Sequence, residues 1–336
     1  MSKPRKRNTK EKKPELPLTQ ALNFIKVAQV DKGMDLALKS HCRLANGYAV
    51  AFDGVLAVGH PIEEEINTCP HTYRLIDALK RCKTTISITQ LDGDKLVIKS
   101  GGFRVVIPCL NPAAIPYAVP DANVGVIDDT IKEGFTLLNP IVSGTGSTTV
   151  EASLLLQNNS MVATDRLTML EFWHGINLPD NLAIPKVAIV AVGKIAKKLI
   201  GIGVSGKTVT FHYEGGAWLR TQLYDEPWPD VGRILNAGDP HKAVDVPPAL
   251  FDAVQAVAPF SPDGAVHTFD GAVSSHNVEG AGATYDTKGI TPGLCFGHKH
   301  LLIAKDTAKT IDLVGRNNVT YFYGERVRGA ISQRKG

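Results

Sequence analysis

The stretch ISITQLDGDKLVIKSGGFRVVI, residues 86–107, alternates apolar and polar side chains and is interrupted twice by turn residues. Alternation bounded by Gly, Asp and Asn predicts three antiparallel strands joined by tight turns. The same layout recurs in IGVSGKTVTFHYEGGAWLRTQL at 202–223 and in TIDLVGRNNVTYFYGERVRGAI at 310–331. Each second turn contains a glycine: Gly102, Gly216 and Gly324. These glycines are 114 and 108 residues apart, so the period is that of a repeated domain.

Two helical stretches precede each three-strand meander. Apolar residues spaced three or four apart predict the first helices at Leu18–Val30, Asp129–Val142 and Pro247–Ala258. The second helices are predicted at Thr72–Lys83, Val187–Leu199 and His298–Lys309. The chain therefore reads as three copies of one α+β unit.

The repeats give the domain boundaries. We predict a disordered basic tail at residues 1–16 and three domains at 17–123, 124–237 and 238–336. Three similar domains in one chain favour a ring or an arc, because repeated units meet through repeated interfaces.

Composition is that of a globular protein. The chain has 336 residues, of which 43% are hydrophobic and 21% charged. No apolar run approaches the roughly 18 residues that span a bilayer, and no signal peptide is recognisable. An odd number of cysteines without CxxC spacing favours reduced thiols in a cytoplasm over a structural zinc site. These are Cys42, Cys69, Cys82, Cys109 and Cys295.

Positive charge is concentrated at the N-terminus. Residues 1–15 hold seven basic and two acidic side chains, a net charge of +5, whereas the whole chain carries +4. The remaining residues therefore carry −1. The tail has almost no apolar residues, which predicts disorder. It either adds loose affinity for nucleic acid or only aids solubility.

The second helix of each repeat is basic. Lys194 and Lys198 are four residues apart, as are Lys305 and Lys309, which predicts that each pair shares one helical face. One basic helix is usually a solvated face, but three at equivalent places favour contact with a phosphate backbone, without sequence preference. No aromatic residues interleave with the basic ones, so duplex DNA is favoured over single strands. The predicted DNA-binding residues are Arg74, Lys80, Arg81, Lys194, Lys197, Lys198, Lys299, Lys305 and Lys309.

Residues 201–208, GIGVSGKT, match the phosphate-binding pattern GxxxxGK[ST]. That loop works where a strand precedes it and a helix follows, because the helix N-terminus holds the phosphates. Here a helical stretch precedes the match and an alternating strand follows it. We therefore predict a hairpin turn, and keep a P-loop nucleotide-binding protein as the alternative.

No catalytic constellation is recognisable. The histidines, including His298 and His300, show no metal-ligand spacing and suggest surface positions. No nucleophile elbow is present. The sequence predicts no enzyme, no metal and no cofactor.

Three short motifs resemble the bacterial DNA sliding clamp, the beta subunit of the replicative DNA polymerase. The segment Val162–Leu167, VATDRL, is similar to the family's VATDGHRL. The segment Trp228–Leu235, WPDVGRIL, resembles FPDYRRVLP, and Ala51–Gly59 resembles the family's first strand pair. The resemblance covers nearly all of residues 17–336. The family's Gly-His pair and its apolar C-terminal tail are missing, which suits a divergent, phage-encoded clamp with an altered partner preference.

The resemblance implies a homodimeric ring that encircles duplex DNA and tethers the polymerase, with a separate ATP-driven clamp loader. Edge strands at the ends of the chain would pair across the two interfaces of the ring. The positions matching the family's partner-peptide pocket are Thr164, Arg166, Leu167, Pro229, Arg233, Ile234, Ala330 and Ile331. A non-encircling DNA-binding protein of the same fold remains an alternative.

Overall fold

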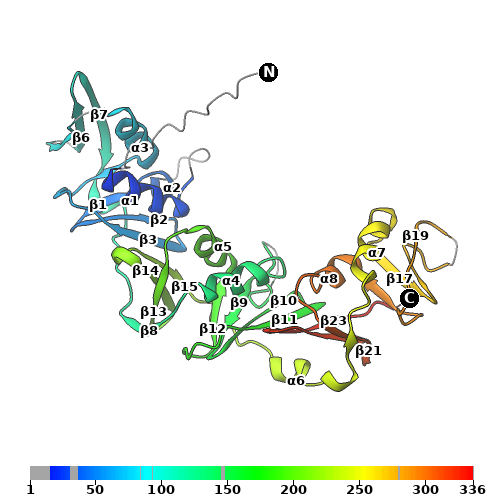
Figure 1. Ribbon diagram of the computed structural model, residues 1–336. Helices are drawn as coiled ribbons and strands as arrows, with labels where there is room; N and C mark the ends of the chain where they lie inside the picture. The colour runs from blue at the N-terminus through cyan, green and yellow to red at the C-terminus, as the bar shows by residue number, and fades with distance from the viewer. Residues whose placement is uncertain are drawn as a thin grey trace, which may run out of the picture. The chain divides into compact units, whose positions relative to one another are not determined.

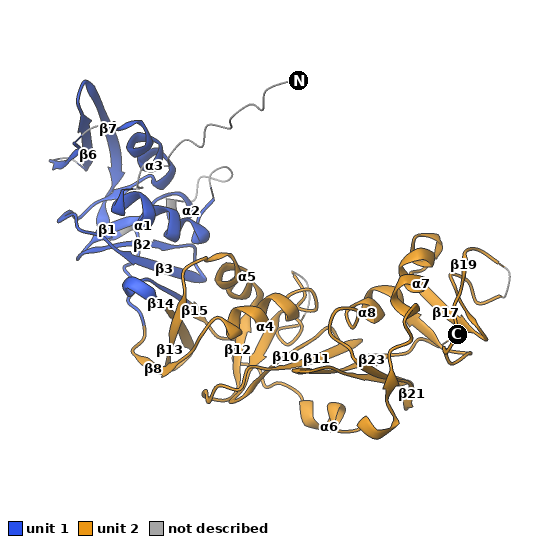
Figure 2. Ribbon diagram, viewed as in Figure 1, with its two compact units in different colours: residues 1–120, 213–220 blue, residues 121–212, 221–336 orange. Residues whose placement is uncertain are grey.

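The computed structural model describes residues 16–30, 37–83, 85–92, 94–144, 148–278 and 281–335. The predicted basic tail lies outside the described residues, apart from Leu16. The chain divides into two compact units, shown in blue and orange in Figure 2: residues 1–120 with 213–220, and residues 121–212 with 221–336. Each unit is described by itself.

The first unit contains the first predicted repeat. Strands β1, β2 and β3 form consecutive antiparallel pairs, and β4, β7, β6 and β5 form a second sheet in that order. Trp218, at the start of β15 (Trp218–Gln222), packs against Val50 and Ala57. The helices are α1 (Pro17–Ile25), α2 (Ala37–Ser40) and α3 (Thr72–Arg81), with short 3-10 turns η1 (Lys26–Ala28) and η2 (Pro112–Ala114). The strands are β1 (Arg43–Ala45), β2 (Tyr48–Phe52), β3 (Leu56–Pro61), β4 (Cys69–Pro70), β5 (Ser87–Leu91), β6 (Lys95–Ser100) and β7 (Phe103–Leu110).

The second unit is organised around an eight-stranded antiparallel sheet with the order β12-β9-β10-β11-β23-β22-β21-β16 (Figure 1). Its strands are β9 (Ser153–Leu156), β10 (Ser160–Thr164), β11 (Thr168–Trp173), β12 (Leu182–Pro185), β16 (Val244–Asp245), β21 (Thr310–Arg316), β22 (Val319–Tyr323) and β23 (Val327–Ser332). Strands β11 and β23 pair directly, from Thr168 opposite Ile331 to Phe172 opposite Val327. One sheet therefore joins segments that are more than 150 residues apart in sequence.

Two smaller groups of strands complete this unit. Strands β8 (Asn123–Val126), β13 (Leu199–Ser205) and β14 (Thr208–Tyr213) are neighbours, and β19 (Thr284–Asp286), β18 (Ala272–Ser274), β17 (Ala265–Phe269) and β20 (Cys295–Gly297) form a four-stranded sheet. The helices are α4 (Thr130–Leu138), α5 (Lys186–Lys194), α6 (Val231–Leu235), α7 (Leu250–Val257) and α8 (His298–Leu302). The 3-10 turns of this unit are η4 (Pro240–Lys242) and η5 (Ala258–Phe260), whereas η3 (Glu214–Gly216) belongs to the first unit.

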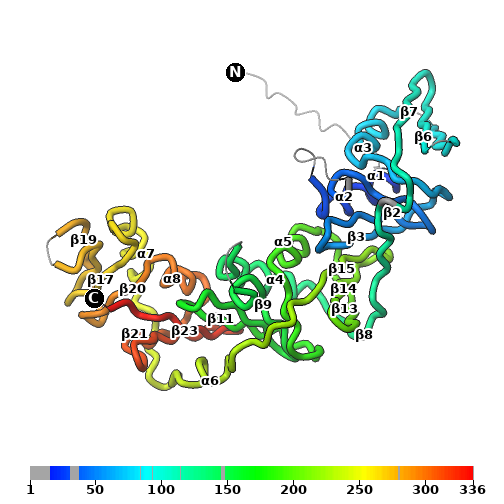
Figure 3. The backbone as a smooth tube through the Cα atoms, turned by 180° about the vertical axis from the view of Figure 1, so that it is seen from behind, coloured from blue at the N-terminus to red at the C-terminus, as the bar shows by residue number. Residues whose placement is uncertain are grey.

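The central strands of the large sheet are covered on both faces. Met161 and Phe172 lie against Gly134 of α4, whereas Val162, on the other face, packs with Val231 and Leu235 of α6. Figures 1 and 3 show α4 and α6 on opposite sides of the sheet. Every residue of β9 and β10 is buried, which explains their continuous apolar runs in place of alternation. The loop carrying α6 is thereby fixed to the sheet.

The predicted α+β class and all three meanders are confirmed, as β5–β6–β7, β13–β14–β15 and β21–β22–β23. The predicted helices exist but are shorter. The second helix of the middle repeat ends at Lys194 and not at Leu199, because Ile195 adopts an extended backbone. The equivalent helix of the last repeat ends at Leu302 and not at Lys309. Helical spacing over these segments was therefore misleading.

The prediction of three domains remains a prediction. Apart from residues 213–220, the second and third predicted domains fall in one compact unit, because β11 and β23 are paired. Among the described residues, no helix is both long enough and apolar enough to cross a bilayer.

Candidate functional site

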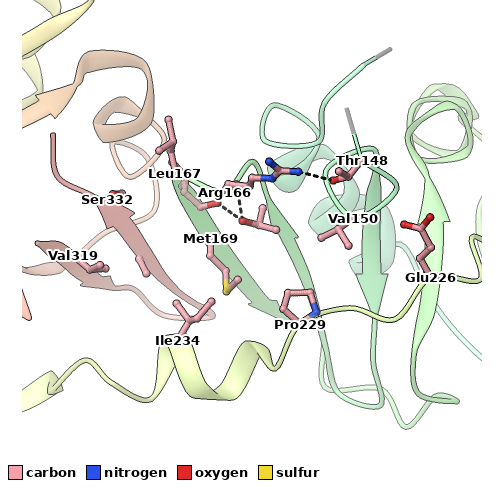
Figure 4. A pocket seen from close by; sticks show the side chains of 13 residues that line it. Thr148, Val150, Arg166, Leu167, Met169, Glu226, Pro229, Ile234, Val319 and Ser332 are labelled. Atoms are coloured by element: carbon pink, nitrogen blue, oxygen red, sulfur yellow. Dashed lines mark hydrogen bonds between the residues drawn. The ribbon is translucent and has the colours of Figure 1, made fainter. Parts of the chain in front are cut away.

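A largely apolar cavity of the second unit lies beside the β10–β11 turn and has a volume of about 640 Å³. Figure 4 shows its side chains converging from the turn, from α6 with the loop before it, from β22 and β23, and from the segment before β9. Six of the eight predicted pocket residues line it. They are Thr164, Arg166, Leu167, Pro229, Ile234 and Ala330.

The other two predicted pocket residues do not line the cavity. Ile331 is fully buried and points away from it, because successive side chains of β23 face opposite sides of the sheet. Arg233 is exposed on α6, next to Ile234. The structure therefore brings six of the eight residues to one cavity, and their use as a peptide pocket remains a prediction.

Seven residues that line the cavity were not predicted from the sequence. Met169 and Val319 are predictable only once the pairing of β11 and of β22 with β23 is known. Thr148, Val150 and Glu226 carried no signal, because nothing in the motifs links these segments to the turn. The missed residues are Thr148, Val150, Thr168, Met169, Glu226, Val319 and Ser332.

Hydrogen bonds hold the β10–β11 turn. The Asp165 carboxylate accepts from the N–H groups of Leu167 at 3.0 Å and Thr168 at 2.6 Å. Thr164 Oγ1 accepts from the Arg166 N–H at 3.1 Å and donates to the Thr168 carbonyl at 2.8 Å. Arg166 has φ +72°, a left-handed conformation that costs energy in a non-glycine residue. The surrounding bonds therefore fix Leu167 with its side chain toward the cavity.

A histidine from α8 completes this turn. His300 Nδ1 lies 3.1 Å from Asp165 Oδ2 and 3.2 Å from Thr168 Oγ1. Burial by itself raises the pKa of Asp165, but the hydrogen bonds from His300 and from the Thr168 and Leu167 N–H groups outweigh it, so the pKa lies below its usual value. The surface role predicted for His298 and His300 is wrong, since His298 Nδ1 also bonds internally, to the Gly264 carbonyl at 2.8 Å.

The opposite wall is built by α6. Asp230 caps the helix by accepting from the Arg233 N–H at 3.0 Å. Val231 and Leu235 face the sheet and are buried, which leaves Ile234 at the cavity. Ile234 is 38% exposed and Leu167 is 46% exposed. Two large apolar side chains therefore stand open on opposite walls of one groove.

The phosphate-loop match is a hairpin turn, as predicted. Residues 201–208 run from β13 through a turn at Gly206, with φ +55°, into β14. A side chain at Gly203 would come within 2.7 Å of the Asp121 and Ala122 carbonyls, so this glycine serves strand packing. Lys207 pairs with Asp225, and Thr208 Oγ1 donates to the Asp121 carboxylate at 3.0 Å.

The predicted DNA-binding residues differ in their surroundings. Arg74, Lys80 and Arg81 are exposed on α3. Lys194 is exposed at the end of α5, but Lys197 and Lys198 lie beyond the helix, so the shared helical face predicted for Lys194 and Lys198 is wrong.

Two basic residues of the last repeat form ion pairs within the unit. Lys305 and Lys309 follow α8 and do not share a helical face, contrary to prediction. Lys305 Nζ lies 3.5 Å from Asp252 and 2.6 Å from Gln255 of α7, and Lys309 Nζ lies 3.3 Å from Glu325. Lys299 is exposed on α8. Across the described residues, no group of three or more His, Cys, Asp or Glu side chains is arranged to hold a metal ion.

The fold is that of the DNA polymerase III beta sliding clamps. A Pseudomonas aeruginosa sliding clamp crystallised with a ligand matches with a TM-score of 0.78 and 14% identity, over 95% of this chain and 98% of that chain. The Caulobacter crescentus polymerase III beta chain matches with a TM-score of 0.77 and 17% identity, over the same shares of both chains. A Helicobacter pylori beta clamp bound to a DNA ligase peptide matches with a TM-score of 0.70 and 14% identity, over 95% of this chain and 98% of that chain. No protein-family profile and no curated protein sequence matches the chain.

Proposed function

We propose that this protein is a DNA sliding clamp, a processivity factor that encircles duplex DNA and tethers a replicative DNA polymerase. The observation that supports this most strongly is a likeness of fold to clamps that extends over 95% of the chain. A tether raises the effective concentration of the polymerase at the primer end without any new chemistry. On this proposal the protein is a cytoplasmic accessory subunit and not an enzyme.

Topological linkage to DNA is the property that tests the proposal. The protein, with a clamp loader and ATP, should remain on nicked circular DNA during gel filtration. It should dissociate once a restriction enzyme linearises the circle. Equal retention on circular and linear DNA would favour the alternative of a non-encircling DNA-binding protein.

A protein that encircles DNA must form a closed ring. We propose that two copies of this three-domain chain form the ring as a homodimer. Light scattering should give twice the mass of 36.1 kDa. A stable monomer at micromolar concentration would contradict the ring.

The DNA contacts are proposed to be loose and sequence-independent, because tight contacts would slow sliding. Reversing charge in Lys194→Glu with Lys198→Glu should lower affinity and flatten the log–log salt dependence by about one unit for each phosphate that is no longer bound. The matched control is Lys95→Glu with Lys99→Glu, two exposed lysines of β6 that make the same charge change. Residues 2–15 are deleted in all proteins, because their +5 charge would mask the difference. An equal slope in both variants would remove Lys194 and Lys198 from the DNA surface.

The groove between the β10–β11 turn and α6 is proposed to bind short peptides from the polymerase and the clamp loader, which would compete for it. Its support is geometric: Leu167 and Ile234 stand half-exposed in one cavity, as apolar anchors of a docking peptide require. One clamp of this fold has been crystallised with a DNA ligase peptide. Fluorescence anisotropy with a labelled polymerase C-terminal peptide, competed by loader peptide, tests this use.

A further inference from the structure

The groove is apolar on one side and charged on the other. Leu167, Met169 and Ile234 surround its apolar part, with Val319 and Ala330 beside them (Figure 4). Thr148 and Glu226 lie toward the other side, past Pro229, and Arg166 extends toward Thr148. A segment that fills the groove therefore meets apolar walls and charged side chains at different positions along its length.

The cation at the charged side is already neutralised. Arg166 pairs with Glu151, whose side chain is only 13% exposed, and Arg166 Nη2 lies 3.5 Å from Thr148 Oγ1. Glu151 also accepts from the Thr148 N–H at 3.4 Å. This closed pair contributes no net charge to the groove.

Glu226 is different. Its carboxylate accepts from the Thr149 hydroxyl, and among the described residues it has no cationic partner. Its neighbour Asp225 is paired with Lys207. Among the described residues that line it, the groove thus carries one uncompensated negative charge, beside its apolar part. A ligand's positive charge placed there gains an ion pair, whereas a negative charge meets repulsion.

The chain's own N-terminus does not supply such a ligand. Residues 2–15 are rich in Lys and Arg but contain no large apolar side chain to fill the part of the groove beside Leu167 and Ile234. The occupant that fits both halves belongs to another protein.

We propose that Glu226 is a specificity-determining residue of this groove, selecting partner segments that carry a lysine or arginine beside their apolar anchors; this rests on the proposed peptide-binding function. Because Glu226 is exposed, the effect is moderate: an exposed ion pair changes the dissociation constant by about two- to fivefold. It weakens further as salt rises.

The test uses short dye-labelled peptides with two leucines and a phenylalanine, identical except for Lys or Glu on the N-terminal or the C-terminal side of these anchors. Dissociation constants are measured by anisotropy on the full chain at low and high salt. The wild type should prefer a Lys peptide over its Glu counterpart. Glu226→Gln should remove the preference and Glu226→Lys should reverse it. Asp225→Asn, one residue away and outside the groove, should keep it.

Each result bears on a different claim. If the peptides bind, and Leu167→Asp abolishes binding, but the Lys preference is absent or persists in Glu226→Gln, the role of Glu226 is overturned while peptide binding stands. If no peptide binds, or binding is unaffected by Leu167→Asp, the proposed peptide-binding function fails and the role of Glu226 fails with it.

Discussion

Two hairpin turns of the second unit each carry a sequence motif, and they differ in what the motif predicts. The turn within residues 201–208 matches a phosphate-binding pattern at every position, yet its glycines serve a turn and close strand packing. The turn at 165–167 matches the clamp motif incompletely, yet its side chains line a largely apolar groove of about 640 Å³. The comparison teaches that flanking elements decide what a short motif does.

The physical difference lies in what holds each turn. Asp165 is half-buried and receives two backbone N–H groups and His300. In the other turn, Lys207 forms an ion pair with Asp225, and their side chains are 73% and 75% exposed. The first turn is therefore fixed by several side-chain hydrogen bonds that are in part buried, whereas the second is held by an exposed ion pair and by the Thr208 hydroxyl.

The largest expected effect comes from placing a charge in the groove. Leu167→Asp or Ile234→Asp should weaken peptide binding about 100-fold or more, because a docked peptide would bury an unpaired carboxylate. Both side chains are partly exposed in the free protein, so folding should be retained. Val314→Asp, an exposed position on β21, is the control. Normal binding by both folded variants would place the peptide site elsewhere.

The next effect compares the two turns directly. Asp165→Ala leaves two N–H groups of a half-buried turn without their acceptor, which should cost about 1–3 kcal/mol of unfolding free energy and weaken peptide binding. Asp225→Ala removes an exposed ion pair and should cost about 0–1 kcal/mol. Urea denaturation measures both. Equal destabilisation by the two substitutions would mean that the two turns are held alike.

The strands of both hairpins could be predicted because their turn residues and alternation are local signals. The ends of α5 and α8 could not, since Ile195 and Ala304 continue an apolar helical spacing beyond the helix. The Asp165–His300 contact joins residues 135 positions apart and has no periodic signature. The resemblance to clamps located six of the groove residues. The resemblance did not identify Glu226, because the position of this residue at the groove depends on the path of the loop before α6.

A smaller effect should appear with pH in both hairpins. Burial lowers the pKa of His174, which follows β11, and of His212, in β14. The unfolded chain then binds protons at higher pH than the folded one, so stability is complete above about pH 6.5 and falls as the pH drops below it. The urea midpoint should therefore decrease between about pH 7.5 and 5.5. His174→Gln with His212→Gln should flatten this dependence; a pH-independent wild type would contradict it.

The smallest effect is expected from Lys207→Ala. A variant that behaves like the wild type would support the interpretation of residues 201–208 as a hairpin turn. In a phosphate-binding loop this lysine contacts the nucleotide phosphates, and its removal abolishes binding. Here the residues after it form β14 and not a helix, so no row of helix N-terminal amides can hold phosphates. Lys207→Ala should change stability by less than about 1 kcal/mol. It should leave clamp loading intact, and neither the variant nor the wild type should bind ATP in equilibrium dialysis. An ATPase activity that requires Lys207 would reverse the comparison, because the turn with the complete motif would then be the functional one.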